Sequence, residues 1–253
     1  MALALGPSDV LGDGLIYLSG DPSQYPGAWE QLCAPPFNIV RVVRVLRDPA
    51  PPPSSMMTTL HLPVEDHVLA PLSQYFQTAC DFIESGVLLK QPTLVHCAAG
   101  VSRSVSIVLA YLVQKRSFSL AGALEKVRLT RPFVNPNQGF LQQLVEWEVS
   151  QRGTAPSLDA DEEFLTTMGR HFGKTLSSNE LRSIYHSPEC KKNPTRFTSL
   201  VAERIEEDDY TTYLHLRFPV RSQQECRDVF LFVKRDVERA IEVLSGTDTY
   251  SDK

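Results

Sequence analysis

The sequence has no excess of basic charge: its 253 residues contain 25 Lys and Arg against 30 Asp and Glu, a formal net charge of −5. General nucleic-acid binders and basic membrane-surface proteins rely on a positive surface. The sequence also has no apolar run near the roughly 18–20 residues that span a bilayer. We therefore expect neither a nucleic-acid partner nor a membrane partner.

Signals for export and for thiol-based metal sites are also missing. The first residues lack the basic segment of a signal peptide, so we expect reduced thiols in the cytoplasm, with access to the nucleus. The 5 cysteines include no Cys-x-x-Cys pair, which excludes a zinc ribbon and a thioredoxin motif. We expect no metal site. An odd number of scattered thiols raises the question of whether one of them is reactive; they are Cys33, Cys80, Cys97, Cys190 and Cys226.

Apolar patterning over residues 14–152 alternates between the period of a strand and that of a helix. Such alternation predicts an α/β domain over residues 1–152, with a central sheet flanked by helices. In folds of this kind, ligands bind beyond the carboxyl ends of the strands. The predicted strands are 14–20, 37–46, 58–66 and 92–97, and the predicted helices are 26–32, 70–88, 103–116, 119–129 and 135–149.

The pattern changes near Gly153–Pro156, and residues 157–253 are predicted to form a separate α+β extension. Serine at a helix start, with glutamate three residues later, is typical of a capping box. The expected features are a helix capped by Ser157, capping boxes at Ser177–Glu180 and Ser222–Glu225, and a strand over 210–220.

One short segment, LVHCAAGVSRS, combines a thiol with an anion-binding geometry. Cys97 lies where a buried strand ends, and Arg103 opens the following apolar helix. Small residues between them allow the backbone to curl, so that its N–H groups and the helix N-terminus surround a tetrahedral anion. Arg103 can bind two phosphate oxygens at once. The same positive field favours the thiolate of Cys97, which makes it a candidate nucleophile.

This segment resembles the HCxxGxxRS signature of the cysteine-dependent protein phosphatases. The full string HCAAGVSRS is most similar to the dual-specificity branch, in particular to its small atypical members. The resemblance covers about residues 14–150, including the LPVED and PNQGF segments. It implies the mixed α/β sheet of that family, and it does not extend to residues 157–253.

The resemblance implies a two-step hydrolysis through a phosphocysteine on Cys97, with no cofactor and no metal. Arg103 and the N–H groups of the loop hold the equatorial phosphate oxygens, and Ser104 assists the departing thiolate. His96 orients the loop and helps to favour the thiolate of Cys97. Asn137 supports it or caps the next helix, and the two roles are compatible. The phosphate-binding loop consists of Ala98, Ala99, Gly100, Val101, Ser102 and Arg103, where Ser102 fits as a small residue.

A carboxylic acid must protonate the leaving oxygen, and composition alone does not identify it. Asp66, Glu65, Asp81 and Asp48 all precede the cysteine. Asp81 falls on the polar side of a predicted helix, where a solvated role is typical. In the family the acid follows a strand that ends in a pattern like LPVxD, and this selects Asp66 as the general acid.

The uncharged loop residues Ala98, Ala99 and Val101 indicate the substrate class. Phosphoinositide phosphatases of this superfamily place lysines there, so a phosphoprotein is favoured, with both phosphotyrosine and phosphoserine/threonine accepted. The alternatives are a non-protein phosphate, or a phosphoprotein-binding scaffold whose C-terminal unit is the main functional part. That unit could bind a protein partner or dimerise. Cys33 and Cys80 are expected in the core, where either could trap an oxidised Cys97.

Overall fold

The structure is a computed structural model of the whole chain. It describes residues 6–48, 57–172, 176–193, 196–202, 214–215, 221, 223–232 and 237–244. The chain divides into two compact units, Met1–Asp159 and Ala160–Lys253. Each unit is considered by itself.

The first unit contains one five-stranded sheet in the order β1-β2-β5-β3-β4. The β1–β2 pair is antiparallel, whereas β2–β5, β5–β3 and β3–β4 are parallel. The sheet is therefore mixed, as the sequence predicts. Its strands are β1 (Ser8–Asp9), β2 (Ile16–Ser19), β3 (Arg41–Val45), β4 (Thr58–Leu62) and β5 (Thr93–His96).

Side chains alternate between the two faces of the sheet, because successive residues of a strand point to opposite sides. Val43 and Val95 are part of the main core. Their neighbours Val42 and Leu94 belong to a smaller cluster on the other side, against which Trp29 of the short helix α1 (Ala28–Cys33) packs. Both faces of the sheet are therefore covered.

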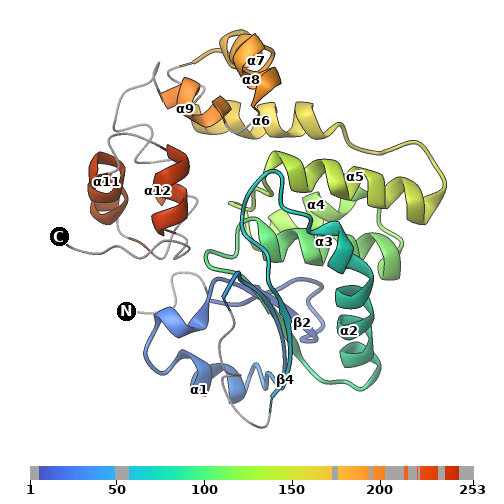
Figure 1. Cartoon of the computed structure of the whole chain (residues 1–253). Helices are drawn as coiled ribbons and strands as arrows, with labels where there is room; N and C mark the ends of the chain where they lie inside the picture. Colours follow the sequence, from blue (N-terminus) through green and yellow to red (C-terminus); the bar gives the residue numbers. More distant parts are fainter. Residues whose placement is uncertain are drawn as a thin grey trace. The chain divides into compact units, whose positions relative to one another are not determined.

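Helices cover the main face of the sheet, as Figure 1 shows, and their buried side chains join the main core. The central one is α3, which is buried from its first residue, Arg103, to Val113. An apolar surface around the whole helix is what a position between neighbouring helices and a sheet requires. The helices are α2 (Phe76–Leu88, preceded by a 3-10 turn at Ser73–Tyr75), α3 (Arg103–Arg116), α4 (Leu120–Thr130) and α5 (Gln138–Arg152).

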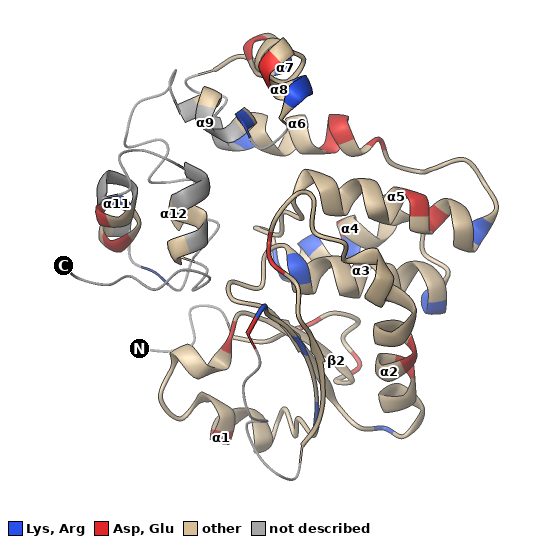
Figure 2. Ribbon diagram, viewed as in Figure 1, with Lys and Arg blue, Asp and Glu red and all other residues tan. Residues whose placement is uncertain are grey.

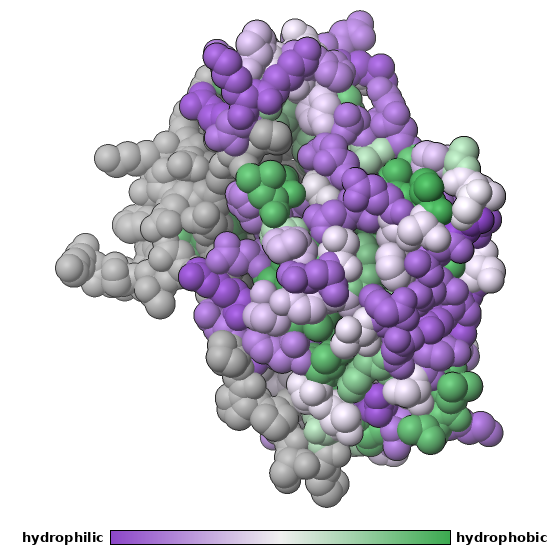
Figure 3. Space-filling view, turned by 45° about the vertical axis from the view of Figure 1, so that its right-hand side comes forward, coloured by the Kyte–Doolittle hydropathy of each residue, from purple (hydrophilic) through white to green (hydrophobic). Residues whose placement is uncertain are grey.

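Hydrophobic residues that remain on the surface are scattered. Figure 3 shows them in small groups among hydrophilic residues on the face it presents. The most exposed ones in the first unit are Leu69, Leu88, Leu89 and Leu129. Single exposed apolar residues of this kind are normal in globular proteins.

The parallel strands end at the same edge of the sheet, and this edge positions the candidate site. Strand β5 ends at His96 and α3 begins at Arg103, so residues 97–102 form the loop between them. Strand β4 ends at Leu62 and is followed by a second loop, residues 63–72, which carries Asp66. We call these the phosphate loop and the acid loop.

The described elements of the second unit are all helices, whereas an α+β extension was predicted. The predicted strand over 210–220 lies outside the described residues, except for Leu214 and His215, which are helical. The helices are α6 (Ala160–Phe172), α7 (Ser178–Tyr185), α8 (Pro188–Lys192), α9 (Arg196–Ala202), α11 (Gln223–Phe232) and α12 (Val237–Leu244).

One local sequence signal in the second unit is confirmed by the structure. The capping box of Ser177 and Glu180 is confirmed at the start of α7. Figure 2 shows acidic residues in the first turn of α6, where the helix dipole favours negative charge. The rings of Phe164 and Phe197 pack edge to face with centroids 5.2 Å apart. Ser222, predicted to begin a second capping box, lies outside the described residues.

The prediction that Ser157 caps a helix is wrong. Its hydroxyl donates to Glu148 Oε1 at 2.7 Å and accepts from the backbone N–H of Ala121 at 3.1 Å. Glu148 is buried, and it also accepts the backbone N–H of Leu120 at 2.7 Å. A buried carboxylate needs such donors, so Ser157 is engaged within the first unit and α6 begins only at Ala160.

Candidate active site

The phosphate loop curls tightly because Gly100 adopts a left-handed backbone conformation, with φ of 67°. A Cβ atom at this position would lie 2.4 Å from the carbonyl carbon of Ser19 at the end of β2. Only glycine combines this φ with so close an approach. Gly100 therefore fixes the loop against the neighbouring strand.

Cys97 sits at the base of this loop with its side chain buried. Its Sγ accepts a hydrogen bond from the backbone N–H of Gly100 at 3.3 Å and another from the hydroxyl of Ser104 at 3.1 Å. Donors aimed at a sulfur stabilise the thiolate, the form that acts as a nucleophile. The structure thus gives Ser104 the contact with the sulfur that the resemblance implies.

Arg103 links the two loops from the first turn of α3. One terminal nitrogen donates to the backbone carbonyl of Val64 at 3.3 Å, and Nε lies 3.9 Å from Asp66 Oδ2. The side chain is buried, and Nε has no hydrogen-bond partner. A buried guanidinium whose Nε–H has no hydrogen-bond partner can donate to an incoming phosphate oxygen.

Among the four candidate acids, Asp66 is the one whose carboxylate the fold brings to the phosphate loop. Its Oδ1 accepts from the hydroxyl of Ser102 at 2.7 Å and from Nδ2 of Asn137 at 2.8 Å. Glu65 instead pairs with Arg47 at 3.2 Å, half exposed. Asp81 binds Lys115 on the exposed side of α2, and Asp48 is exposed in the segment that follows β3. Geometry therefore favours the same residue as the resemblance.

Ser102 and Asn137 do more than their sequence interpretations suggest. The backbone N–H of Asn137 donates to the hydroxyl of Ser102 at 3.1 Å, and its Oδ1 caps α5 by accepting from Phe140 N–H at 2.9 Å. Asn137 is thus both a helix cap and a support for the site. Ser102, expected only to fit the loop as a small residue, connects the loop to Asp66 through its hydroxyl.

His96 lies beneath the loop and is almost completely buried. Burial lowers the pKa of its imidazole to about 4, although Asp21, whose Oδ1 is 3.8 Å from Nδ1, opposes this shift. The ring packs edge to face against Trp29 at 5.7 Å. A neutral ring at this place supports the loop by packing and adds no positive charge to the thiolate's surroundings. This corrects the expectation that His96 favours the thiolate through its charge.

Arg131 is a structural part of the site that the sequence interpretation missed. Its Nε donates to the carbonyl of Gly100 at 2.8 Å, and a terminal nitrogen donates to that of Ala99 at 3.3 Å. Burial lowers the pKa of this guanidinium to about 10. These contacts fix the carbonyls of Gly100 and Ala99, while the N–H of Gly100 donates to Cys97 Sγ. The only local sequence signal is an arginine directly before Pro132 at a helix end.

Residues after β2 hold the other end of the phosphate loop. The carbonyl of Ala98 accepts from the backbone N–H of Asp21 at 3.0 Å and from Nε2 of Gln24 at 3.2 Å. Neither residue was predicted as part of the site. Polar residues following a strand at the active edge are the one signal that could have identified them.

The five cysteines are all free. Cys80 is buried in the same core cluster as Cys97, and burial raises the pKa of its thiol to about 12. A thiol of this kind is a poor nucleophile. Cys33 is exposed, which corrects the expectation that it belongs to the core. Its place at the end of α1 leaves its side chain on the surface.

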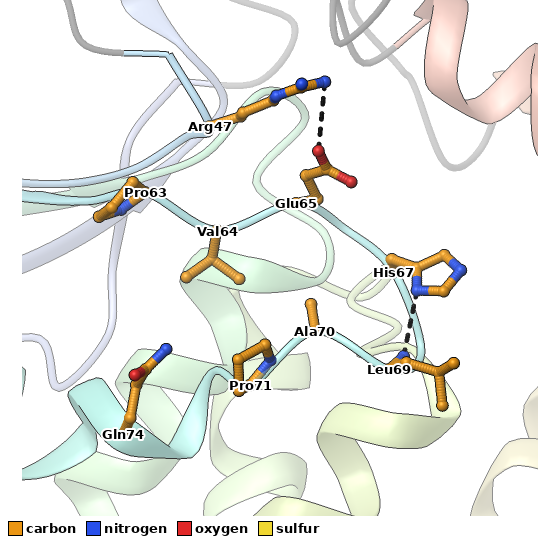
Figure 4. Close-up of a pocket in the computed structure, with 9 residues that line it drawn as sticks. All are labelled: Arg47, Pro63, Val64, Glu65, His67, Leu69, Ala70, Pro71 and Gln74. Carbon is orange, nitrogen blue, oxygen red and sulfur yellow. Dashed lines mark hydrogen bonds and ion pairs between the residues drawn. The ribbon is translucent and has the colours of Figure 1, made fainter.

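A hollow of about 370 Å³ lies along the acid loop. Figure 4 shows Pro63, Val64 and Pro71 beside it, with Glu65 turned toward Arg47. Asp66 is not among the residues that line it. The loop therefore directs Asp66 toward the phosphate loop, while neighbouring residues face the hollow.

Neither a metal site nor a membrane-spanning helix is found in the part of the chain that the structure describes. Within that part, no group of three or more His, Cys, Asp or Glu side chains is arranged to hold a metal ion. Across the same residues, no helix has both the length and the apolar character needed to cross a membrane.

Comparison with known proteins identifies the family of the first unit. Residues 36–150 match the family described as dual specificity phosphatase, catalytic domain. Mouse dual specificity protein phosphatase 18 is 42% identical over 94 residues, which cover 37% of this chain and 50% of that protein. Human dual specificity protein phosphatase 15 is 38% identical over 117 residues, 46% of this chain and 39% of that protein. The matched segment thus spans half or less of these curated relatives.

The solved structures agree with the sequence matches. The crystal structure of DUSP15 superimposes with a TM-score of 0.52 at 31% identity, covering 58% of this chain and 90% of that one. Cys97, Arg103 and Asp66 lie together at the carboxyl edge of the sheet. The fold, the sequence matches and the geometry of the site therefore agree. The chain belongs to the dual specificity phosphatase family.

Proposed function

We propose that this chain is a protein phosphatase that removes phosphate from phosphotyrosine and from phosphoserine or phosphothreonine. The observation that carries the proposal is the convergence of three groups. Cys97 Sγ accepts two hydrogen bonds, Arg103 has a buried donor without a hydrogen-bond partner, and Asp66 lies beside them. Nucleophile, anion clamp and acid are the parts that phosphate monoester hydrolysis needs.

The first step forms a phosphocysteine. The thiolate of Cys97 attacks phosphorus in line, so that an S–P bond forms while the P–O bond to the leaving group breaks. Asp66, protonated at this stage, transfers its proton to the leaving oxygen. Arg103 and the inward N–H groups of the phosphate loop stabilise the charge on the three equatorial oxygens.

The second step returns the enzyme to its starting state. The carboxylate of Asp66 removes a proton from a water molecule, whose oxygen attacks phosphorus as the S–P bond breaks. Inorganic phosphate leaves, and Cys97 is again a thiolate. Ser104 donates a hydrogen bond to the sulfur of Cys97 from 3.1 Å away. This donor makes the sulfur a better leaving group.

The preference for phosphoproteins rests on the loop side chains and on the relatives. Ala98, Ala99 and Val101 carry no charge with which to bind additional phosphates of an inositol ring. The matched relatives are named as dual specificity protein phosphatases. A phosphorylated protein side chain, with one phosphate, fits a loop of this kind.

Location and the role of the second unit complete the proposal. Five free cysteines are consistent with a reducing compartment, so we place the protein in the cytoplasm with access to the nucleus.

We assign the unit from Ala160 onward to binding a protein partner or a second copy of the chain. Light scattering of the purified chain tests the second of these roles: a monomeric mass at all concentrations would leave partner binding alone.

The experiment that tests the activity is a parallel assay without added metal. Peptides with phosphotyrosine or phosphothreonine, a phosphoinositide and a phosphorylated glucan are compared at equal concentration. We expect turnover of both peptides and the lowest rate on the phosphoinositide. Turnover of the phosphoinositide or glucan alone would reassign the substrate, and no turnover of any substrate would favour a binding role.

A further inference from the structure

One helix, α5, contacts the acid loop at three successive points. At its N-cap, Nδ2 of Asn137 donates to the carboxylate of Asp66 at 2.8 Å. Gly139, the second residue of the helix, lies against the backbone of Val68. At the next turn, Gln143 reaches the end of the loop. The helix thus contacts the carboxylate itself and then the chain that follows it.

The contact at Gly139 has no room for a side chain. A Cβ atom there would lie 1.8 Å from the carbonyl oxygen of Val68 and 2.6 Å from its carbonyl carbon. These are backbone atoms, so they move only if the loop moves. Any residue other than glycine at position 139 therefore displaces the chain two residues after Asp66.

The contact at Gln143 uses both ends of its amide. Nε2 donates to the carbonyl of Ala70 at 2.9 Å, and Oε1 accepts the backbone N–H of Ser73 at 2.8 Å. A single side chain therefore fixes the conformation of the chain between these two residues. Upstream of Asp66, the carbonyl of Val64 is held by Arg103. Asp66 therefore lies between two fixed positions of the backbone, Val64 before it and Ala70 after it.

We propose that Gly139 and Gln143 are positioning residues for the general acid: they hold the acid loop so that Asp66 faces the phosphate leaving group. This inference rests on the proposed function. Gly139 lies against the backbone of Val68, and Gln143 binds backbone atoms of Ala70 and Ser73, so each acts on Asp66 through the chain. Small displacements of a proton donor are costly, since a misplacement of about 1 Å can reduce a rate by about 100-fold.

The dependence of the rate on the leaving group separates positioning from general damage. A phenol has a pKa of about 10, as tyrosine does, and leaves poorly without a proton. A dinitrophenolate leaves readily as the anion. Loss of acid positioning therefore slows phenyl phosphate hydrolysis and spares dinitrophenyl phosphate, whereas a damaged phosphate loop slows both.

The test uses the full chain with Gln143→Met, which keeps the length of the side chain and removes the hydrogen bonds to Ala70 and Ser73, together with the one to the carbonyl of Gly139 within α5. Ser73 is exposed and Ala70 half-buried, so water replaces the lost partners and the fold is retained. We expect kcat/KM for phenyl phosphate to fall about tenfold, as part of the 10²–10⁴-fold typical of general acid catalysis. For dinitrophenyl phosphate we expect a change of less than about twofold, and Gly139→Ala should show the same selectivity.

Two reference variants complete the experiment. Gln151→Met removes an amide from the same helix that bonds with Gln114 instead of the acid loop, and should leave both rates unchanged. Asp66→Asn should show the full leaving-group selectivity. An equal fall for both substrates in Gln143→Met, or no fall for either, overturns the inference while wild-type activity upholds the proposed function. A wild-type chain that hydrolyses neither substrate overturns the proposed function itself.

Discussion

The hydroxyl of Ser102 donates a 2.7 Å hydrogen bond to Oδ1 of Asp66. A residue of the phosphate loop thereby holds the carboxylate of the acid loop, although 36 positions separate them in the sequence. The same hydroxyl accepts the backbone N–H of Asn137 at 3.1 Å, which sets the direction of its own proton. This oxygen therefore links the phosphate loop, the proposed acid and the start of α5.

Ser102→Ala should weaken the acid and leave the phosphate loop intact. One of the two side-chain donors to Oδ1 of Asp66 is lost, while the loop N–H groups and Arg103 stay in place. We expect kcat for phenyl phosphate to fall about fivefold, within the range of a single hydrogen bond of about 1 kcal/mol. Steady-state kinetics measures this, with Ser85→Ala on α2 as the control. An unchanged kcat would mean that Asn137 alone orients the acid.

Asp66→Asn should change the shape of the pH profile as well as the rate. At high pH the wild-type rate falls because the acid has lost its proton, and an amide has no proton to lose in this range. We expect kcat to fall by about 10²–10³-fold on phenyl phosphate, and the basic limb of the kcat/KM profile to disappear. A basic limb that persists would point to another acid, with Glu65 tested next.

Ser104→Ala should slow the second step more than the first. The hydroxyl bonds to Cys97 Sγ at 3.1 Å, and its loss removes a donor from the sulfur that departs as a thiolate. We expect the phosphocysteine to accumulate, seen as a burst of product in rapid-quench kinetics and as added phosphate on the Cys97 peptide by mass spectrometry. The absence of a burst together with a wild-type steady-state rate contradicts this role.

The stability of the fold should depend on pH through His96. Its pKa is about 4 in the folded chain, and about 6.5 when unfolded. Between these values the unfolded chain binds the proton and the folded chain does not, so stability falls as the pH falls. The contribution is about 2 kcal/mol between pH 7 and pH 5.

Denaturant unfolding at the two pH values measures this contribution. His96→Asn, which does not titrate in this range, should lose less stability than the wild type over the same interval. Equal losses in both proteins would show that His96 does not contribute to the acid sensitivity.

The sequence predicts the part of the site that is local. Cys97 to Ser104 lie on one continuous strand–loop–helix segment, so their order along the chain specifies their geometry. Asp66 needed the resemblance, because nothing in its own surroundings distinguishes it from Glu65. In space the difference is clear: Glu65 faces Arg47 at the surface, and Asp66 meets Ser102.

Residues that support the site from a distance were not predictable. Arg131 binds carbonyls 31 and 32 positions earlier in the chain. Gln143 binds Ala70 of the acid loop, 73 positions earlier, and Ser73 just after the loop, 70 positions earlier. Their side chains resemble ordinary helix-surface residues, and only the packing of α5 and of the α4 terminus against the loops gives them partners. Ser157 is a similar case. Its place in the sequence is typical of a helix cap, but in the fold its hydroxyl donates to the buried carboxylate of Glu148.

The central claim is that the thiol of Cys97 is the nucleophile, and the turnover of Cys97→Ser tests it most directly. A serine hydroxyl in the same place is far less ionised than a thiol at neutral pH, while the loop N–H groups and Arg103 remain to bind phosphate. We predict that the purified Cys97→Ser chain hydrolyses no measurable aryl phosphate under conditions in which the wild type turns over. Wild-type turnover by Cys97→Ser would contradict the account.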